Sequence, residues 1–206
     1  MIEQGSIEWK LQRLGHVTAS RVADVMAKGR NGEAKSREDY RFQLACERLS
    51  GTFQEGYTSQ AMEWGTNTEP EARMAYEVEC KSFVDQVSFI KHPEMEFVGC
   101  SPDGLVGEQG GLEIKCPNSE THLRTIYEQK IPSKYYPQVQ MSMWVTGRHW
   151  WDFVSYDPRL PPELRFFVVR ILRDEEYIQE MEAEVKQFLL DVEKTIELVK
   201  ERRNAK

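Results

Sequence analysis

The stretch SPDGLVGEQGGLEIKCP, residues 101–117, decides the fold of this chain. A Pro-Asp-Gly turn at Asp103 is followed by a glycine-rich loop and a short strand. Side chains alternate along a strand, so Glu113 and Lys115 share one face while their neighbours point into the core. The inward set is Leu112, Ile114 and Cys116. Because residues 104–111 can form a hairpin that returns Glu113 beside Asp103, the sequence predicts two carboxylates and one ammonium at the end of a sheet.

This trio of charged groups has a specific chemical use. Two neighbouring carboxylates repel each other unless a hard cation lies between them, and oxygen ligands suit Mg²⁺ or Mn²⁺. Such an ion can generate hydroxide from water and stabilise the oxygens of a phosphoryl displacement, while a lysine orients the water or offsets developing charge. The same spacing also occurs in ordinary hairpins with an exposed Glu and Lys face, so the pattern alone leaves both interpretations open.

The segments around this hairpin predict a mixed α/β or α+β fold, in which a central mixed sheet is flanked by helices. A stripe of apolar residues at steps of three and four after Asp174 predicts a long amphipathic C-terminal helix. Ser36 and Asp39 are spaced as a capping box, and Gly65 and Pro70 predict an interruption of the third helix. Helices are expected over residues 18–29, 36–51, 59–79, 120–130, 134–146 and 174–206, and strands over 83–90, 95–100, 112–116, 150–156 and 165–172.

Composition favours a single soluble domain over the 206 residues, of which 40% are apolar. The sequence has no long apolar run and no basic leader, so we expect no membrane-spanning helix and no secretory signal. The four cysteines form no CxxC pair, so we expect a cytoplasmic location. The net charge of −7 argues against nucleic-acid binding by bulk charge, although residues 10–37 hold seven bases against two acids. Those bases form either a DNA-contacting surface or ordinary solvated helix faces.

Several sequence blocks, in order, resemble the bacteriophage lambda exonuclease family, the YqaJ-like viral recombinases of the PD-(D/E)XK nuclease superfamily. Pro102-Asp103 with Glu113-Ile114-Lys115 matches the superfamily motif. The similar blocks are LQRLGHVTAS (11–20), WGTNTE (64–69), CSPDGL (100–105), LEIKCP (112–117), QVQMSMWVT (138–146) and YDPR (156–159).

The resemblance implies a Mg²⁺-dependent exonuclease that degrades one strand of linear double-stranded DNA from 5′ to 3′. It would release 5′-mononucleotides and leave 3′ overhangs for a phage-type single-strand annealing protein. Two Mg²⁺ ions are implied, with Mn²⁺ as a substitute, together with a ring-shaped homotrimer and a phage or prophage origin in a bacterial cell. One nuclease domain is expected over residues 1–206. Its parts are a helical DNA-contacting segment (1–57), a catalytic core (58–173) and the C-terminal helix (174–206).

The resemblance also implies roles for individual residues. Asp103 and Glu113 match metal-binding carboxylates, the Ile114 carbonyl matches a further ligand, and Lys115 matches the catalytic lysine. Two more catalytic positions are implied, Glu69 and Gln140. The DNA-binding positions are Arg13 and Ser20 at the 5′-terminal phosphate, Arg30 along the DNA, and Met62 as an apolar wedge between the strands.

Each of these roles has a simpler alternative. Glu69 could stabilise a helix N-terminus, and Gln140 could be a solvated helix residue. Met62 could fill the core, and Arg13 and Arg30 could be surface charges. At the level of function, an endonuclease on the same core and a non-catalytic DNA-end clamp remain alternatives.

Overall fold

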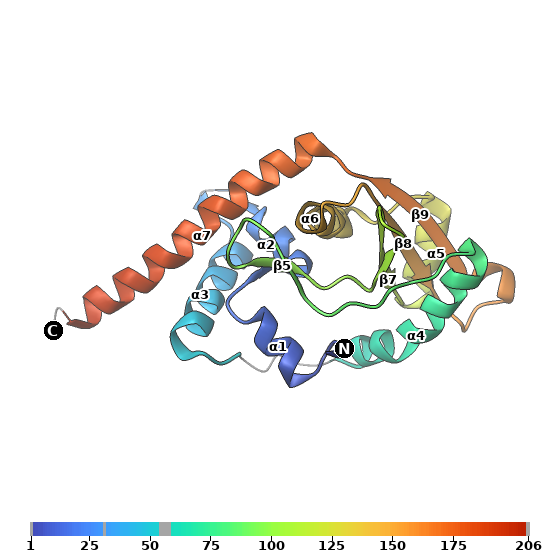
Figure 1. Ribbon diagram of the computed structural model, residues 1–206, viewed down its shortest axis with the longest axis horizontal. Helices are drawn as coiled ribbons and strands as arrows, with labels where there is room; N and C mark the ends of the chain where they lie inside the picture. Colours follow the sequence, from blue (N-terminus) through green and yellow to red (C-terminus); the bar gives the residue numbers. More distant parts are fainter. Residues whose placement is uncertain (1, 31, 54–58, 205–206) are drawn as a thin grey trace.

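The computed structural model describes residues 2–30, 32–53 and 59–204 (Figure 1). Within them, no helix is both long and apolar enough to cross a bilayer. The helices are α1 (Ile7–Arg13), α2 (Val22–Val25), α3 (Lys35–Ser50), α4 (Gln60–Cys80), α5 (Ser119–Glu128), α6 (Tyr136–Thr146) and α7 (Glu175–Asn204), with 3-10 turns at Ala19–Arg21, Ser133–Tyr135 and Pro162–Leu164. The strands are β1 (Val17–Thr18), β2 (Lys28–Gly29), β3 (Gly32–Glu33), β4 (Ile90–Lys91), β5 (Val98–Cys100), β6 (Gly104–Val106), β7 (Gly110–Lys115), β8 (Trp150–Tyr156) and β9 (Phe166–Leu172).

A mixed four-stranded sheet in the order β6-β7-β8-β9 forms the centre of the fold. β6 and β7 are antiparallel, β7 and β8 are parallel, and β8 and β9 are antiparallel. Helices cover both faces: α4 packs on one, and α6 packs on the other, where His122 of α5 also meets Ser155 of β8 (Figure 1). The predicted fold class, a mixed sheet flanked by helices with a long C-terminal helix, is confirmed.

The two faces of this sheet carry separate apolar clusters. On one face, Ala72 and Tyr76 of α4 pack against Leu112 and Ile114 of β7 and against Cys116, which follows it. On the other, Val139 and Met143 of α6 pack against Trp151 and Phe153 of β8 and Ile171 of β9. The alternation of β7 therefore directs Glu113 and Lys115 toward the face that α6 covers.

A third cluster joins the N-terminal part of the chain to the C-terminal helix. It takes residues from α2 and α3, from β5 and α6, and from the apolar stripe of α7. Within it, the rings of Tyr40 and Phe188 stack with centroids 5.5 Å apart. The N-terminal segment, which includes Arg13, is thus packed in a shared core with β5, the strand that leads into the Asp103 turn. The expected division near residues 57 and 58 lies outside the described residues.

Some local predictions are wrong, for identifiable physical reasons. α4 runs without interruption, capped by the Ser59 hydroxyl, which accepts from the amide of Met62. Pro70 removes only one amide, and the burial of Ala72 and Tyr76, two and six residues farther on, stabilises the helix through it. α3 begins at Lys35 without a side-chain cap, so the capping box predicted at Ser36 does not form.

Two further differences concern the segments beside the site. The strand expected over residues 83–90 is reduced to Ile90–Lys91 and a single bridge between Asp85 and Leu105, and the Phe83 side chain is 92% exposed. The helix expected over residues 18–29 is a 3-10 turn followed by the four residues of α2. Thr18 precedes the 3-10 turn without a side-chain cap bond.

Candidate active site

The β6–β7 hairpin places the two motif acids side by side. Its register pairs Gly104 with Leu112, and the Asp103 amide donates to the Leu112 carbonyl at 3.2 Å. The Asp103 Oδ2 atom accepts from the amide of Ile114 at 2.6 Å. A Cβ atom at Gly110 would lie 2.1 Å from the ring of Trp150, so the close approach of β8 requires glycine there. The hairpin expected over residues 104–111 is therefore present.

Glu113 is the most deeply buried acid of the site, with 1% of the residue exposed. Its Oε1 atom accepts from Lys115 Nζ at 2.5 Å and from Gln138 Nε2 at 2.6 Å. Its Oε2 atom is buried and has no hydrogen-bond partner in the described part of the chain. Burial raises the pKa of Glu113 to about 7; Lys115 opposes the shift and Asp103 adds to it.

Glu69 joins these two acids from α4. Arg73, one helical turn later, pairs with Glu69 Oε1 and also donates from Nε to the Asp103 carbonyl at 3.2 Å. Burial raises the pKa of Glu69 to about 7, and the negative charge of Asp103 contributes to the shift. Burial likewise raises the pKa of Asp103, against the attraction of Lys115. Because the charge of Asp103 raises the pKa of both Glu69 and Glu113, the three acids lie within electrostatic reach of each other.

Lys115 supplies the positive charge of the cluster. Burial lowers the pKa of an amine, but the attraction of Glu113 and Asp103 outweighs that effect, and the pKa of Lys115 lies above its ordinary value. Its Nζ atom lies 5.3 Å from the ring centroid of Tyr135. The group is therefore an ammonium held between a carboxylate and an aromatic ring. The structure brings together Glu69, Asp103, Glu113 and Lys115.

The donors present fit a hard cation. No group of three or more His, Cys, Asp and Glu side chains converges as ready metal ligands in the residues that the structure describes. Mg²⁺, however, commonly binds through one or two carboxylates and completes its shell with water and phosphate oxygens. The unpartnered Oε2 atom of Glu113 is the oxygen that such an ion would satisfy. Ile114 meets Asp103 through its amide, and a role for its carbonyl as a ligand stays a prediction.

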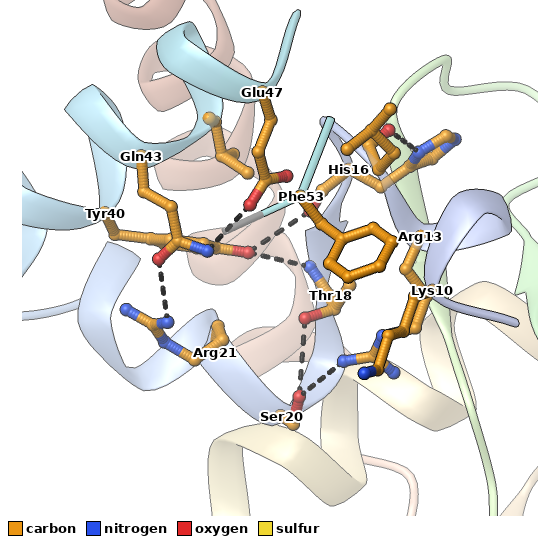
Figure 2. Close-up of a pocket in the computed structure, with 12 residues that line it drawn as sticks. Lys10, Arg13, His16, Thr18, Ser20, Arg21, Tyr40, Gln43, Glu47 and Phe53 are labelled. Carbon is orange, nitrogen blue, oxygen red and sulfur yellow. Dashed lines mark hydrogen bonds between the residues drawn. The ribbon is translucent and has the colours of Figure 1, made fainter. Parts of the chain in front are cut away.

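A second site, a polar pocket of about 270 Å³, is lined by residues of the N-terminal part of the chain, among them Arg13 and Ser20 (Figure 2). Arg13 donates from Nη1 to Ser101 Oγ at 3.0 Å and from Nη2 to Ser20 Oγ at 3.3 Å, and its guanidinium lies 4.1 Å from the centroid of the Trp9 ring. Lys10 and Arg21 also line the pocket. The sequence pattern does not single out Ser101 as a site residue, although it stands only two residues before Asp103.

The wall of this pocket is a hydrogen-bonded frame. Glu47 is buried there and accepts from the Gly15 amide at 2.8 Å and from Gln43 Nε2 at 2.8 Å. Gln43 in turn accepts from Arg21 Nη1 at 3.2 Å (Figure 2). Glu47 is thus engaged by two donors, while the guanidinium of Arg13 donates to Ser20 and Ser101.

The hydrogen bonds of Gln140 turn its side chain away from the acid cluster, and its catalytic role stays a prediction. Its side chain is fully buried at the start of α7, where Nε2 donates to the Leu172 carbonyl and Oε1 accepts from the amide of Asp174. The glutamine that contacts the acid cluster is Gln138, through Glu113. Residues two positions apart on a helix point to different sides, so only one glutamine of the QVQ block can face the cluster.

The remaining DNA-binding candidates lie apart from the acids. Met62 is in the first turn of α4 and is 58% exposed. Arg30 directly follows β2 and is exposed. The structure gives neither residue a contact with the acid cluster among the described residues, and their roles stay predictions.

Comparisons with known proteins agree with this architecture. The model of the YqaJ-like viral recombinase domain matches residues 8–149. The crystal structure of an alkaline exonuclease, LHK-Exo, from Laribacter hongkongensis is 47% identical with a TM-score of 0.90, covering 97% of this chain and 99% of that one. The same protein in complex with dAMP superposes with a TM-score of 0.91.

Two more distant matches were found. A phage-related exonuclease from Haemophilus somnus 129PT, at 17% identity and a TM-score of 0.72 over 89% of this chain and 96% of that one, shares the fold. The uncharacterized protein ExoD of Escherichia coli (strain K12) is 43% identical over 61 residues, which is 30% of this chain and 69% of that protein. Because the family model covers more than half of the sequence, this chain belongs to the YqaJ-like viral recombinase domain family.

Proposed function

We propose that this protein is a metal-dependent exonuclease that degrades one strand of linear double-stranded DNA from 5′ to 3′ and releases 5′-mononucleotides. The observation that carries the proposal is the short turn from Ser101 to Asp103, which joins a cationic pocket to an acid cluster. The near full-length similarity to an alkaline exonuclease supports the same class of reaction.

The acid cluster would hold one or two Mg²⁺ ions, or Mn²⁺ in their place, through Asp103 and Glu113, with the Ile114 carbonyl as a further ligand. When bound, the ion supplies a Lewis acid for the phosphate oxygens and lowers the pKa of a coordinated water. Gln138 holds Glu113 in place by donating to its Oε1 atom. Glu69 adds a third acid from α4.

Lys115 acts as a cation in this proposal. A general base must release its proton, and the pair with Glu113 keeps the pKa of Lys115 above the ordinary value. The ammonium is therefore suited to orient a water molecule or to offset negative charge on the phosphate. Since Glu69 and Glu113 of the free protein have pKa values of about 7, activity should rise as the pH passes above neutrality.

The pocket lined by Arg13 and Ser20 would explain the 5′ to 3′ direction, and Ser101, which Arg13 contacts, links this pocket to the Asp103 turn. A terminal 5′-phosphate carries more negative charge than an internal phosphate, and a guanidinium can hold it in bidentate geometry. With Ser101 two residues before Asp103, a nucleotide bound in the pocket by its 5′-phosphate would direct its 3′ side toward the acids. Each cleavage then creates a new 5′-phosphate for the pocket, which biases movement forward. The dAMP complex of LHK-Exo fits a product of this kind.

The assembly and biological setting are proposed from the family resemblance. They comprise a ring-shaped homotrimer threaded by DNA, a phage-type single-strand annealing protein that receives the 3′ overhang, and action in the cytoplasm of a bacterial host. Met62 would act as the wedge between the strands, and Arg30 would follow the DNA backbone.

The deciding experiment is a time course on end-labelled linear duplexes that carry either a 5′-phosphate or a 5′-hydroxyl, with Mg²⁺ or with chelator. The wild type should digest the phosphorylated end faster, release mononucleotides from it only with Mg²⁺, and leave a closed circular duplex intact. Arg13→Ala should remove most of the phosphate preference, and Arg13→Lys should restore it only in part. Arg202→Ala, at an exposed position near the end of α7, is the control.

Two results would count against this function. Cleavage of the closed circle would favour an endonuclease. Full phosphate preference in Arg13→Ala would place the 5′ pocket elsewhere.

A further inference from the structure

Side chains from distant segments of the chain donate hydrogen bonds to the main chain of the turn that carries Asp103. Gln4 Nε2 donates to the Pro102 carbonyl at 2.7 Å, and Arg73 Nε donates to the Asp103 carbonyl at 3.2 Å. Of these two, Arg73 also pairs with an acid of the cluster, Glu69. One guanidinium therefore contacts the side chain of one acid and the main chain of another.

The surroundings of Arg73 leave little of this bridge exposed to solvent. Its side chain is 14% exposed, and it lies with Glu69 and Asp103 on the wall of one cavity of about 350 Å³. Glu69 and Arg73 are four residues apart on α4, the spacing at which helix side chains meet. The planar fork of arginine can serve two acceptors at once, whereas the single ammonium of a lysine cannot do so in the same geometry.

We infer that Arg73 is a positioning residue of the acid cluster, which ties the Glu69 carboxylate to the Asp103 turn so that α4 and the hairpin present their acids to an ion in one arrangement. The inference rests on the proposed function, since it concerns acids assigned to a metal site. It extends that function to a residue that does not itself contact the ion.

A purely electrostatic role makes the opposite prediction. If Arg73 only neutralises the acids, removing its positive charge leaves the site more negative, and a divalent cation binds more tightly. If Arg73 positions the acids, its removal frees Glu69 and loosens the turn, and the cation binds more weakly. Outer partners of metal ligands typically contribute about 10–100-fold to metal affinity or activity.

The test is calorimetric titration of Mn²⁺ into the full-length protein without DNA. Arg73→Ala should weaken Mn²⁺ binding by about 10-fold or more. Arg73→Lys, which keeps the charge, should recover only part of the affinity. Arg124→Ala is the matched control, because Arg124 also pairs with a glutamate one turn away, Glu120, but on the exposed face of α5. It should bind Mn²⁺ as the wild type does.

Kinetics on a phosphorylated duplex end provide the second measurement. Positioning predicts a fall in kcat at saturating metal with KM for DNA nearly unchanged, because Arg73 lies on the cavity wall that holds the acids and outside the Arg13 pocket. Thermal melting verifies that each variant is folded. If Arg73→Ala does not fold, the Mn²⁺ affinity of Arg73→Lys decides the question. Unchanged or tighter Mn²⁺ binding, or full affinity in Arg73→Lys, would overturn the inference. A wild type that binds Mn²⁺ but leaves linear DNA intact would instead refute the proposed exonuclease.

Discussion

Burial of Glu113 has a measurable effect on stability. Its pKa of about 7 in the folded protein lies above the ordinary value of 4.5 that it regains on unfolding. Between these pH values the folded protein keeps a proton that the unfolded chain has released, so the free energy of unfolding falls as the pH rises. The stabilising contribution is complete below pH 4.5 and is lost above pH 7.

The size of this effect follows from the interval between the two pKa values. One proton of difference is worth about 1.4 kcal/mol per pH unit, so the metal-free protein loses on the order of 3 kcal/mol through Glu113. For a chain of this length, 1 kcal/mol corresponds to roughly 2–4 °C in Tm, and the expected loss is roughly 6–12 °C. Glu69 and Asp103 act in the same direction, because their pKa values are also raised.

Thermal melting in chelator at pH 5 and pH 8 isolates the contribution of Glu113. Glu113→Gln imitates the protonated acid, so it should melt within a few degrees of the wild type at pH 5 and roughly 6–12 °C higher at pH 8. Glu120→Gln, at an exposed acid on α5, should follow the wild type at both pH values. If Glu113→Gln and the wild type lose stability equally between pH 5 and pH 8, the reasoning about this buried acid fails.

Addition of Ca²⁺ completes the same test. An ion that binds only the folded protein at 100 times its Kd adds about 2.7 kcal/mol. Ca²⁺ should therefore stabilise the wild type at pH 8, do so far less at pH 5, and have little effect on Glu113→Gln. Equal stabilisation of Glu113→Gln would place the ion elsewhere.

Three further predictions concern the acids, the glutamines and the assembly. Asp103→Ala and Lys115→Ala should each lower cleavage by at least about 100-fold while duplex-end binding persists, and near-normal turnover by either variant in Mg²⁺ would refute its assignment. Gln138→Ala should lower kcat by about 10–100-fold with an unchanged Tm. Gln140→Ala should lower Tm and leave kcat at low temperature unchanged. The reverse pattern would show that Gln140, and not Gln138, acts at the acid cluster. Sedimentation of the protein at micromolar concentration should give a mass near that of three chains, and a strict monomer that digests kilobases without releasing DNA would contradict the ring.

The sequence by itself determines the β6–β7 hairpin. Its turn depends on neighbouring residues, and the alternation of β7 assigns Glu113 and Lys115 to one face whatever the rest of the chain does. The long helix α7 is determined in the same local way, by its apolar stripe and by Asp174, whose Oδ1 atom accepts from the amide of Tyr177 at its start. Interactions within a few residues are enough for both.

Only the tertiary structure decides which distant side chains meet that hairpin. The choice between Gln138 and Gln140 depends on the rotation of α6 against the sheet, which the packing of Val139 and Met143 sets. Arg73 and Ser101 acquire their partners because α4 continues through Pro70 and because β5 lies beside the N-terminal segment, where β1 pairs with it. These contacts join residues from 30 to 88 positions apart, and burial of the shared core, which has no local sequence signal, brings them together.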